Sequence, residues 1–279
     1  MKNLNSLVTK EQISDVAQNC VKVALKKWAS NYQIKYSKKS NLQSKNHLDI
    51  LFPKERRIHS VIQSALTSFG RAGWEPLAND LASLGGYEVF SADKFNKHAP
   101  KIPKLLRDFK QKIRAKIQSK DIKIQSGLNE IKSFIKEKNL VPEEINKIES
   151  GQGIDFWFRK DDYELIGDIK SPQDNIGNGL KLIDHALIWG TCRLLEDPEI
   201  QIEAVIAFPY NPYEDLDVYM KEQGQKFYLH NYGQDILIAD SFWDKLTGYS
   251  GTTRVIFDSI KSLSNSDEIR EIRKLFDIK

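Results

Sequence analysis

The chain has 279 residues, with 42 Lys and Arg side chains against 38 Asp and Glu and a formal net charge of +4. Hydrophobic residues make up 40% of the chain and charged residues 29%, which excludes collagenous, fibrous and fully disordered proteins. There is no apolar run of the roughly 18 residues that a membrane-spanning helix needs and no apolar signal core at the start, so a cytoplasmic protein is expected.

Helical periodicity dominates the first half of the chain, where the expected helices cover residues 9–30, 56–69, 76–84 and 103–140. The polar, lysine-rich residues 31–57 are expected to form a linker. Gly70 and Gly73 should end the second helix, and Pro76 fits the first turn of the third. Residues 103–140 should divide near Gly127 into two basic amphipathic helices.

The second half of the chain changes to strand periodicity. The expected strands cover residues 87–90, 154–160, 163–170, 201–208 and 235–239. A helix over residues 178–195 should connect two of these strands by a crossover, which makes the later strand parallel to the earlier one. Ser241 is expected to cap a helix, and two more helices complete the chain.

The positive charge is concentrated in the first half. Residues 1–140 hold 27 basic and 12 acidic side chains, whereas residues 141–279 hold 15 basic and 26 acidic ones. The excess lies in two lysine-rich blocks, residues 20–60 and 91–140. Such blocks can neutralise the phosphates of a nucleic acid, although an ordinary solvated helix face has the same composition.

The expected hairpin at residues 154–170 brings two carboxylates and an amine close together. If Asp161 and Asp162 form a two-residue turn, paired residue numbers sum to 323, so Asp155 faces Asp168 with Cβ atoms about 5 Å apart. Lys170 projects from the same face, two residues beyond. Two adjacent carboxylates repel each other unless a cation lies between them, and hard oxygen ligands favour Mg²⁺.

The spacing of these three residues is not specific by itself. Asp108 and Asp121 precede Lys123 with the same spacing, in a lysine-rich helical stretch where the side chains would not meet. Only the stretch around Asp155 is expected to fold as a hairpin that leads into a helix and an apolar strand. The alternative interpretation is an exposed hairpin with ordinary surface charges.

In this context Asp155 and Asp168-Ile169-Lys170 resemble the PD-(D/E)xK nuclease core, over roughly residues 75–210. The resemblance implies an α/β, restriction-endonuclease-like fold, with a central mixed sheet flanked by helices and added helical N-terminal and inserted segments. It further implies that the two acids bind Mg²⁺, that the Ile169 carbonyl adds a ligand and that the lysine assists hydrolysis. Ile154 stands where the written motif has proline.

A narrower resemblance lies upstream. Residues 64–82 contain a helix, the step Trp74-Glu75-Pro76 and a second helix, and they are similar to a block in the TdeIII-type group of type II restriction endonucleases. Many nucleases of the fold take a further acid from the helix before the first strand, which implies a catalytic role for Glu75. The alternative is an acid that only interacts favourably with a helix dipole.

On this interpretation the whole chain, residues 1–279, forms one nuclease domain. The expected parts are a basic N-terminal helical arm (1–60), a catalytic core (61–90 and 151–240), a basic helical insertion (91–150) and C-terminal helices (241–279). Polar residues near the hairpin are candidates for contacts with DNA: Gln152, Ser171, Gln173, Asn175, Asn178 and Lys181.

The resulting hypothesis is a Mg²⁺-dependent type II restriction endonuclease that hydrolyses double-stranded DNA at a short palindromic site. A palindrome is matched by two-fold symmetry, so a homodimer is expected, with a cognate DNA methyltransferase as its genetic partner and no membrane association. Two alternatives stay open: a repair or junction nuclease of the same fold, and a non-catalytic DNA-binding protein.

Overall fold

The computed structural model describes residues 7–39, 53–142, 144–170, 172, 176–213, 215–222 and 235–274. The chain forms two compact units. We call residues 1–81 with 254–279 the helical unit and residues 82–253 the sheet unit. None of the helices within the described ranges is both long enough and apolar enough to cross a membrane.

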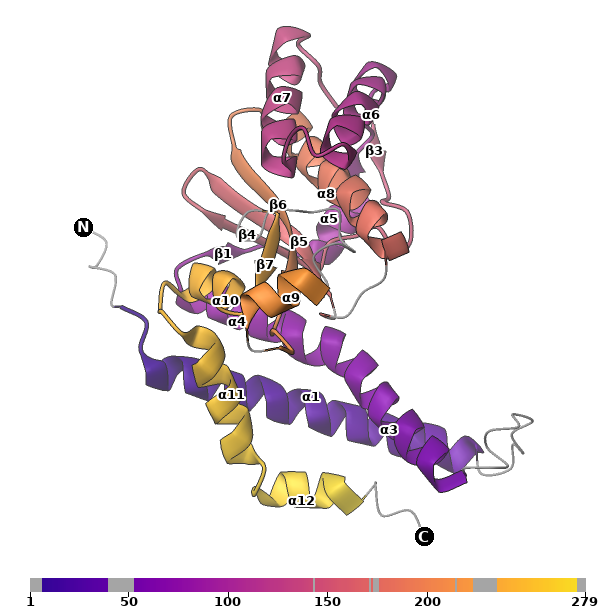
Figure 1. The fold of residues 1–279 in the computed structure, drawn as a ribbon, viewed down its shortest axis with the longest axis vertical. Coiled ribbons are helices and arrows are strands. Elements are labelled where there is room, and N and C mark those ends of the chain that lie inside the picture. The colour runs from indigo at the N-terminus through magenta and orange to yellow at the C-terminus, as the bar shows by residue number, and fades with distance from the viewer. Residues whose placement is uncertain are drawn as a thin grey trace. The chain divides into compact units, whose positions relative to one another are not determined.

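The helical unit is built mainly from α1 (Lys10–Lys39), α3 (Pro53–Phe69), α4 (Glu75–Leu84), α11 (Thr252–Leu263) and α12 (Asp267–Arg273) (Figure 1). The indole of Trp28 in α1 donates a hydrogen bond of 3.3 Å to the Ser64 hydroxyl in α3. The Ser259 hydroxyl in α11 donates one of 2.8 Å to the Ser14 hydroxyl. These contacts tie α1 to its two neighbours.

One expectation for this unit is wrong. Residues 31–39 continue α1 and residues 53–57 belong to α3, so these parts of the expected linker over 31–57 are helical. Lysine is a good helix former, and polarity alone does not end a helix. The second helix ends where expected, because α3 stops at Phe69, directly before the first of the two glycines. A π-helical turn, η1 (Gly70–Trp74), joins α3 to α4 directly. A Cβ on Gly73 would lie 2.7 Å from the Phe69 ring, so this turn needs glycine.

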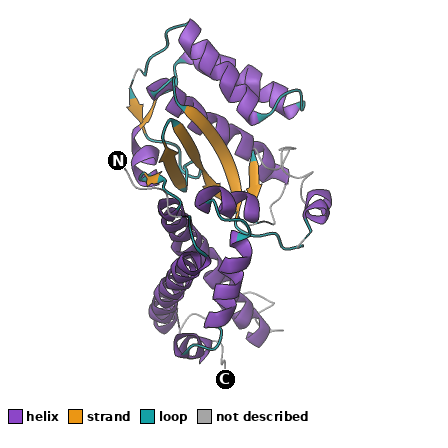
Figure 2. Ribbon diagram, turned by 90° about the vertical axis from the view of Figure 1, so that its left-hand side faces the viewer, coloured by secondary structure: helices purple, strands orange, loops and turns teal. Residues whose placement is uncertain are grey.

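The sheet unit contains a five-stranded mixed sheet in the order β1-β4-β5-β6-β7, shown in orange in Figure 2. The strands are β1 (Glu88–Val89), β4 (Phe156–Lys160), β5 (Tyr163–Ile169), β6 (Gln201–Phe208) and β7 (Ile236–Ile238). The first three pair antiparallel, and β5, β6 and β7 pair parallel. The expected mixed sheet, hairpin and parallel crossover through α8 (Ile176–Glu196) are all present.

Helices cover both faces of this sheet. On one face, Trp157 and Glu164 lie against α8, where Arg193 stacks on the Trp157 ring at 4.8 Å and binds Glu164. The pair α6 (Lys104–Gln118) and α7 (Ile124–Glu137) packs on α8 (Figure 1). On the other face, the rings of Phe156 and Phe242 lie 5.5 Å apart, which joins β4 to α10 (Asp240–Thr247).

The division of the basic helical stretch differs from the expected one. The chain turns at residues 119–123, and Gly127 lies inside α7. A Cβ on Gly127 would lie only 2.6 Å from the Ile113 side chain, so this glycine allows close helix packing. Its role is tertiary, and a helix interior tolerates glycine at a cost of about 1 kcal/mol relative to alanine.

Several short elements have no clear sequence signal. They are α5 (Ala92–His98), the two-stranded sheet of β2 (Ala99–Pro100) and β3 (Ile145–Asn146), and α9 (Leu216–Glu222). Ser241 does not cap α10, whose N-cap residue is Ala239. The Ser241 hydroxyl instead accepts a hydrogen bond from the Ile238 N–H and donates one to the Ile238 carbonyl.

Candidate active site

The hairpin of β4 and β5 has the expected register. Phe156 pairs with Gly167 and Lys160 with Tyr163, so paired residue numbers sum to 323, and Asp161 occupies the turn with φ of +54°. Since opposite residues share a face, Asp155 and Asp168 both point toward the side of the sheet that α8 covers. The two-residue turn therefore fixes the strand register, and the register decides which side chains lie opposite each other.

Three side chains converge at the C-terminal end of β5. The Asp155 N–H donates to the Gly167 carbonyl over 2.8 Å, and the Asp155 carboxylate accepts a hydrogen bond of 3.0 Å from the Ile169 N–H. The Lys170 ammonium lies 2.5 Å from the Asp168 carboxylate. The expected convergence of two acids and an amine is thus confirmed.

The surroundings of Asp168 strongly change its acidity. Asp168 is only 3% exposed, and its pKa is raised well above the usual carboxyl range, first by burial and then by the hydrogen bond and negative charge of Asp155. The ammonium of Lys170 acts in the opposite direction without cancelling the shift. A buried acid beside a second, partly exposed acid favours a proton or a cation between them.

The donors at this position fit a hard divalent cation. Two carboxylates and the neighbouring backbone supply oxygen ligands, the type that Mg²⁺ prefers. Within the described residues, no group of three or more His, Cys, Asp and Glu side chains is placed to hold a metal ion. A metal at Asp155 and Asp168 would keep several waters, as Mg²⁺ commonly does.

The side chain of Asn96 in α5 holds the chain just before Asp155. Its amide nitrogen donates to the Ile154 carbonyl over 3.0 Å, and its amide oxygen accepts from the Ile154 N–H over 2.9 Å. A Cβ on Gly153 would lie 2.7 Å from the same side chain. Asn96 therefore positions the start of β4. The sequence gives no signal for this role, because 58 residues separate it from Ile154.

Helix α8 lines the same side of the sheet with two ring side chains. The pKa of His185 is lowered, first by burial and then by the positive charge of Lys170. The ring centroid of Trp189 lies 5.9 Å from that of His185, and its indole donates a hydrogen bond of 2.6 Å to the Gln152 carbonyl. Only the packing of α8 on the sheet brings these residues to the group around Asp168.

The expected DNA contacts are only partly described. Ser171, Gln173 and Asn175 lie outside the described residues, as does the side chain of Asn178. The Gln152 amide donates a hydrogen bond of 2.8 Å to the Glu149 carboxylate, and the side chain of Lys181 is exposed on α8. Their contacts with DNA stay predictions.

Glu75 is the first residue of α4 and belongs to the helical unit, whereas Asp155, Asp168 and Lys170 belong to the sheet unit. Its participation in the active site therefore stays a prediction. The division of the chain into arm, core, insertion and C-terminal helices also stays a prediction.

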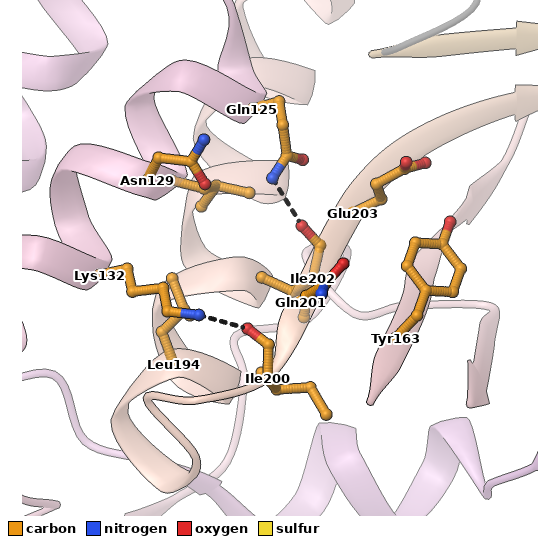
Figure 3. Close-up of a pocket in the computed structure, with 10 residues that line it drawn as sticks. Gln125, Asn129, Lys132, Tyr163, Leu194, Ile200, Gln201, Ile202 and Glu203 are labelled. Carbon is orange, nitrogen blue, oxygen red and sulfur yellow. Dashed lines mark hydrogen bonds between the residues drawn. The ribbon is translucent and has the colours of Figure 1, made fainter. Parts of the chain in front are cut away.

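A separate pocket of about 360 Å³ lies at the opposite end of the sheet (Figure 3). Tyr163, the first residue of β5, lines it, and Asp168 is five residues further along, or about 17 Å in an extended strand. Lys132 donates hydrogen bonds to the carbonyls of Glu199 and Ile200, so its ammonium supports the chain. With Glu203 as the one carboxylate of its lining, this pocket lacks paired acids.

Comparison with known protein families agrees with this geometry. The family described as type II restriction endonuclease, HinfI, matches residues 9–264, which is most of the chain. No curated protein and no solved structure matches it. The match confirms the wider resemblance to restriction endonucleases and gives no support to the narrower one to the TdeIII-type group. The chain therefore belongs to the HinfI family of type II restriction endonucleases and is a deoxyribonuclease, a hydrolase that cleaves DNA.

Proposed function

We propose that the protein is a Mg²⁺-dependent enzyme that cleaves both strands of a short palindromic DNA site as a homodimer. The observation that carries the proposal is the convergence of Asp155, Asp168 and Lys170 at the end of β5. Family membership supports site-specific cleavage of DNA in general. It also argues against a repair or junction nuclease and against a DNA-binding protein without activity.

Asp155 and Asp168 would hold the metal ion, with the Ile169 carbonyl as a further ligand. When bound, such an ion supplies a Lewis acid that polarises the phosphoryl group and lowers the pKa of a coordinated water. Lys170, next to these ligands, would orient the attacking water or stabilise negative charge on the phosphate oxygens.

The basic residues of the first half would provide affinity for the DNA backbone. Lysine predominates there, and lysine contacts phosphates rather than distinguishing bases. The residues after β5, together with Gln152 and Lys181, would approach the bases or the neighbouring phosphates. Glu75 is proposed as a further acid of the active site.

A dimer is supported by the exposed face of α3. Ile58, Ile62 and Leu66 follow one another at intervals of four residues and are 40%, 42% and 58% exposed. Residues at this spacing lie on one side of a helix, so they form an apolar stripe of the kind that a partner can cover. A two-fold dimer would match the symmetry of a palindrome, and a DNA methyltransferase would protect the host DNA at the same site.

One experiment tests the proposal directly. Purified protein is incubated with unmodified phage DNA and Mg²⁺, and the fragment ends are sequenced. Discrete fragments that share one palindromic sequence at their ends support the proposal, and loss of cleavage in EDTA supports the metal requirement. Fragments without a common end sequence would contradict site specificity.

A further inference from the structure

A second cavity, of about 230 Å³, lies in the sheet unit and has a cationic lining. It is bordered by α6, α8, the β2–β3 sheet and the chain that follows β3. Four basic side chains line it: Lys101, Arg107, Lys110 and Lys147. Glu149 is the one acidic residue of the lining.

Lys110 is the unusual member of this set. It is only 7% exposed, and no hydrogen bond or ion pair joins its ammonium to another of the described residues. Its pKa is lowered, first by burial, although the negative charge of Asp184 acts in the opposite direction. Asp184 itself forms an ion pair with Arg114. The stem of Lys110 is buried while its ammonium is accessible from the cavity, so an anion bound there would supply the direct counter-charge that the described residues do not.

The remaining charges do not neutralise the cavity. Lys101 forms an ion pair of 3.0 Å with Glu144, which lies outside the lining. Glu149 accepts a hydrogen bond from the Gln152 amide. Arg107 and Lys147 are in no ion pair with another residue in the part of the chain that the structure describes. The lining therefore has a net positive charge and suits an anion with several acceptor oxygens.

Helix α8 connects this cavity to the active site. Ile188 and Cys192 line the cavity, and His185, one turn earlier, interacts electrostatically with Lys170. At 1.5 Å per residue, Ile188 and Cys192 lie about 5 and 10 Å from His185 along the helix axis. Successive phosphates of one DNA strand advance by about 3.4 Å along the duplex axis. The offset between His185 and the cavity along α8 is therefore comparable to the length of a few nucleotide steps.

We propose that this cavity binds a phosphate group of the DNA strand close to the cleaved bond, with Lys110 as its central counter-charge. The inference rests on the proposed function for its choice of DNA as the source of the phosphate. The anion site itself rests only on the burial of Lys110 and the charges around it. Free phosphate has the same chemistry and is distinguished by experiment.

The first measurement is the salt dependence of DNA binding by the full chain, with Asp168→Ala in the background to prevent cleavage. Lys110→Met should weaken binding about tenfold and reduce the slope of log Kd against log salt by about 0.9, as expected for one lost phosphate contact. Lys112→Met on the exposed side of α6 is the matched control: it loses the same charge and, as one of many exposed lysines of the basic half, should weaken binding much less. Equal effects of the two variants would overturn the proposal.

Thermal melting separates a binding role from a structural one. Removing a buried, unpaired charge should leave the melting temperature of Lys110→Met unchanged or raise it, while DNA binding weakens. A lower melting temperature would instead assign Lys110 to the fold and contradict the proposal. Arg107→Gln, an exposed residue of the same lining, should weaken DNA binding without any effect on folding.

Inorganic phosphate tests the anion site in the absence of DNA. It should raise the melting temperature of the wild-type chain and of Asp168→Ala, but not that of Lys110→Met. Phosphate could stabilise the wild type and not Lys110→Met, while Lys110→Met leaves the salt dependence of DNA binding unchanged. That result would overturn DNA as the occupant in favour of free phosphate. If Mg²⁺ and DNA give no cleavage while phosphate still binds through Lys110, the proposed function fails and the anion site stands.

Discussion

The carboxylate of Asp155 accepts a hydrogen bond of 3.0 Å from the backbone N–H of Ile169. Asp155 lies one residue before β4 begins, and Ile169 is the last residue of β5. The bond therefore closes the open end of the hairpin with a side chain and directs the first acid toward Asp168. Because the whole arrangement depends on one hairpin, substitutions there should change cleavage much more than binding.

Asp168→Ala and Lys170→Ala should each reduce Mg²⁺-dependent DNA cleavage by at least about 100-fold. DNA binding in a gel-shift assay should persist, because the basic residues that contact the backbone are unchanged. Asp161→Asn, in the turn of the same hairpin, is the matched control and should retain activity, since asparagine tolerates a positive φ. Mg²⁺-dependent cutting by the Asp168→Ala, Lys170→Ala double variant would refute the assignment of the active site.

Without metal, the stability of the fold should depend on the protonation of Asp168. The raised pKa of Asp168 means that the folded state binds this proton more tightly than the unfolded chain. Without metal, the free energy of unfolding should therefore fall as pH rises from the ordinary carboxyl range through the folded-state pKa. Asp168→Asn should remove this loss, so in EDTA at neutral pH it should melt at or above the wild-type temperature.

Mg²⁺ should raise the melting temperature of the wild type and not of Asp168→Asn. At a concentration 100 times Kd the stabilisation is about 2.7 kcal/mol. Scanning fluorimetry with a Mg²⁺ titration measures it, and an equal rise in both proteins would show that the ion binds elsewhere.

Asn96→Ala should lower cleavage although Asn96 is not proposed to touch DNA or metal. The variant loses two hydrogen bonds to Ile154 and leaves backbone groups without partners, at a cost of about 1–3 kcal/mol. The start of β4 should then be less well ordered, so kcat should fall more than KM rises. Asn129→Ala, at the opposite end of the sheet, is the control. Equal loss of activity in both variants would argue for general destabilisation.

Glu164→Gln should destabilise the sheet unit. Glu164 is fully buried and forms ion pairs with Arg159 and Arg193. Removal of its charge leaves the buried guanidinium of Arg193 with Glu196 as its remaining counter-charge, at a cost of up to about 3–5 kcal/mol. Urea unfolding should show this loss, whereas Glu137→Gln, which breaks an exposed ion pair with Lys138, should change stability by less than about 1 kcal/mol.

Glu75→Gln tests the proposed further acid. If Glu75 takes part in the active site, cleavage should fall at least about tenfold while the melting temperature and DNA affinity stay unchanged. The same helix carries a suitable comparison in Asp80→Asn, since the Asp80 side chain accepts a hydrogen bond from the Cys20 thiol. Cleavage at the wild-type rate by Glu75→Gln would restrict the active site to the hairpin.

The sequence by itself determined the hairpin and what it brings together. Strand periodicity of two and the two-residue turn at Asp161 leave one register in which the apolar side chains are buried, and that register places Asp155 opposite Asp168. The crossover after β5 followed from the helical period and the apolar strand at residues 201–208. Both signals are local, which is why a single sequence was sufficient.

Only the tertiary structure decided which distant residues surround that group. Asn96 reaches Ile154 from α5, and the packing of α8 brings His185 close to Lys170. The burial of Lys110 depends on how α6 lies against α8, since a lysine on an amphipathic helix is expected to be solvated. Contacts of this kind join residues far apart in the chain, and neither periodicity nor turn chemistry carries information about them.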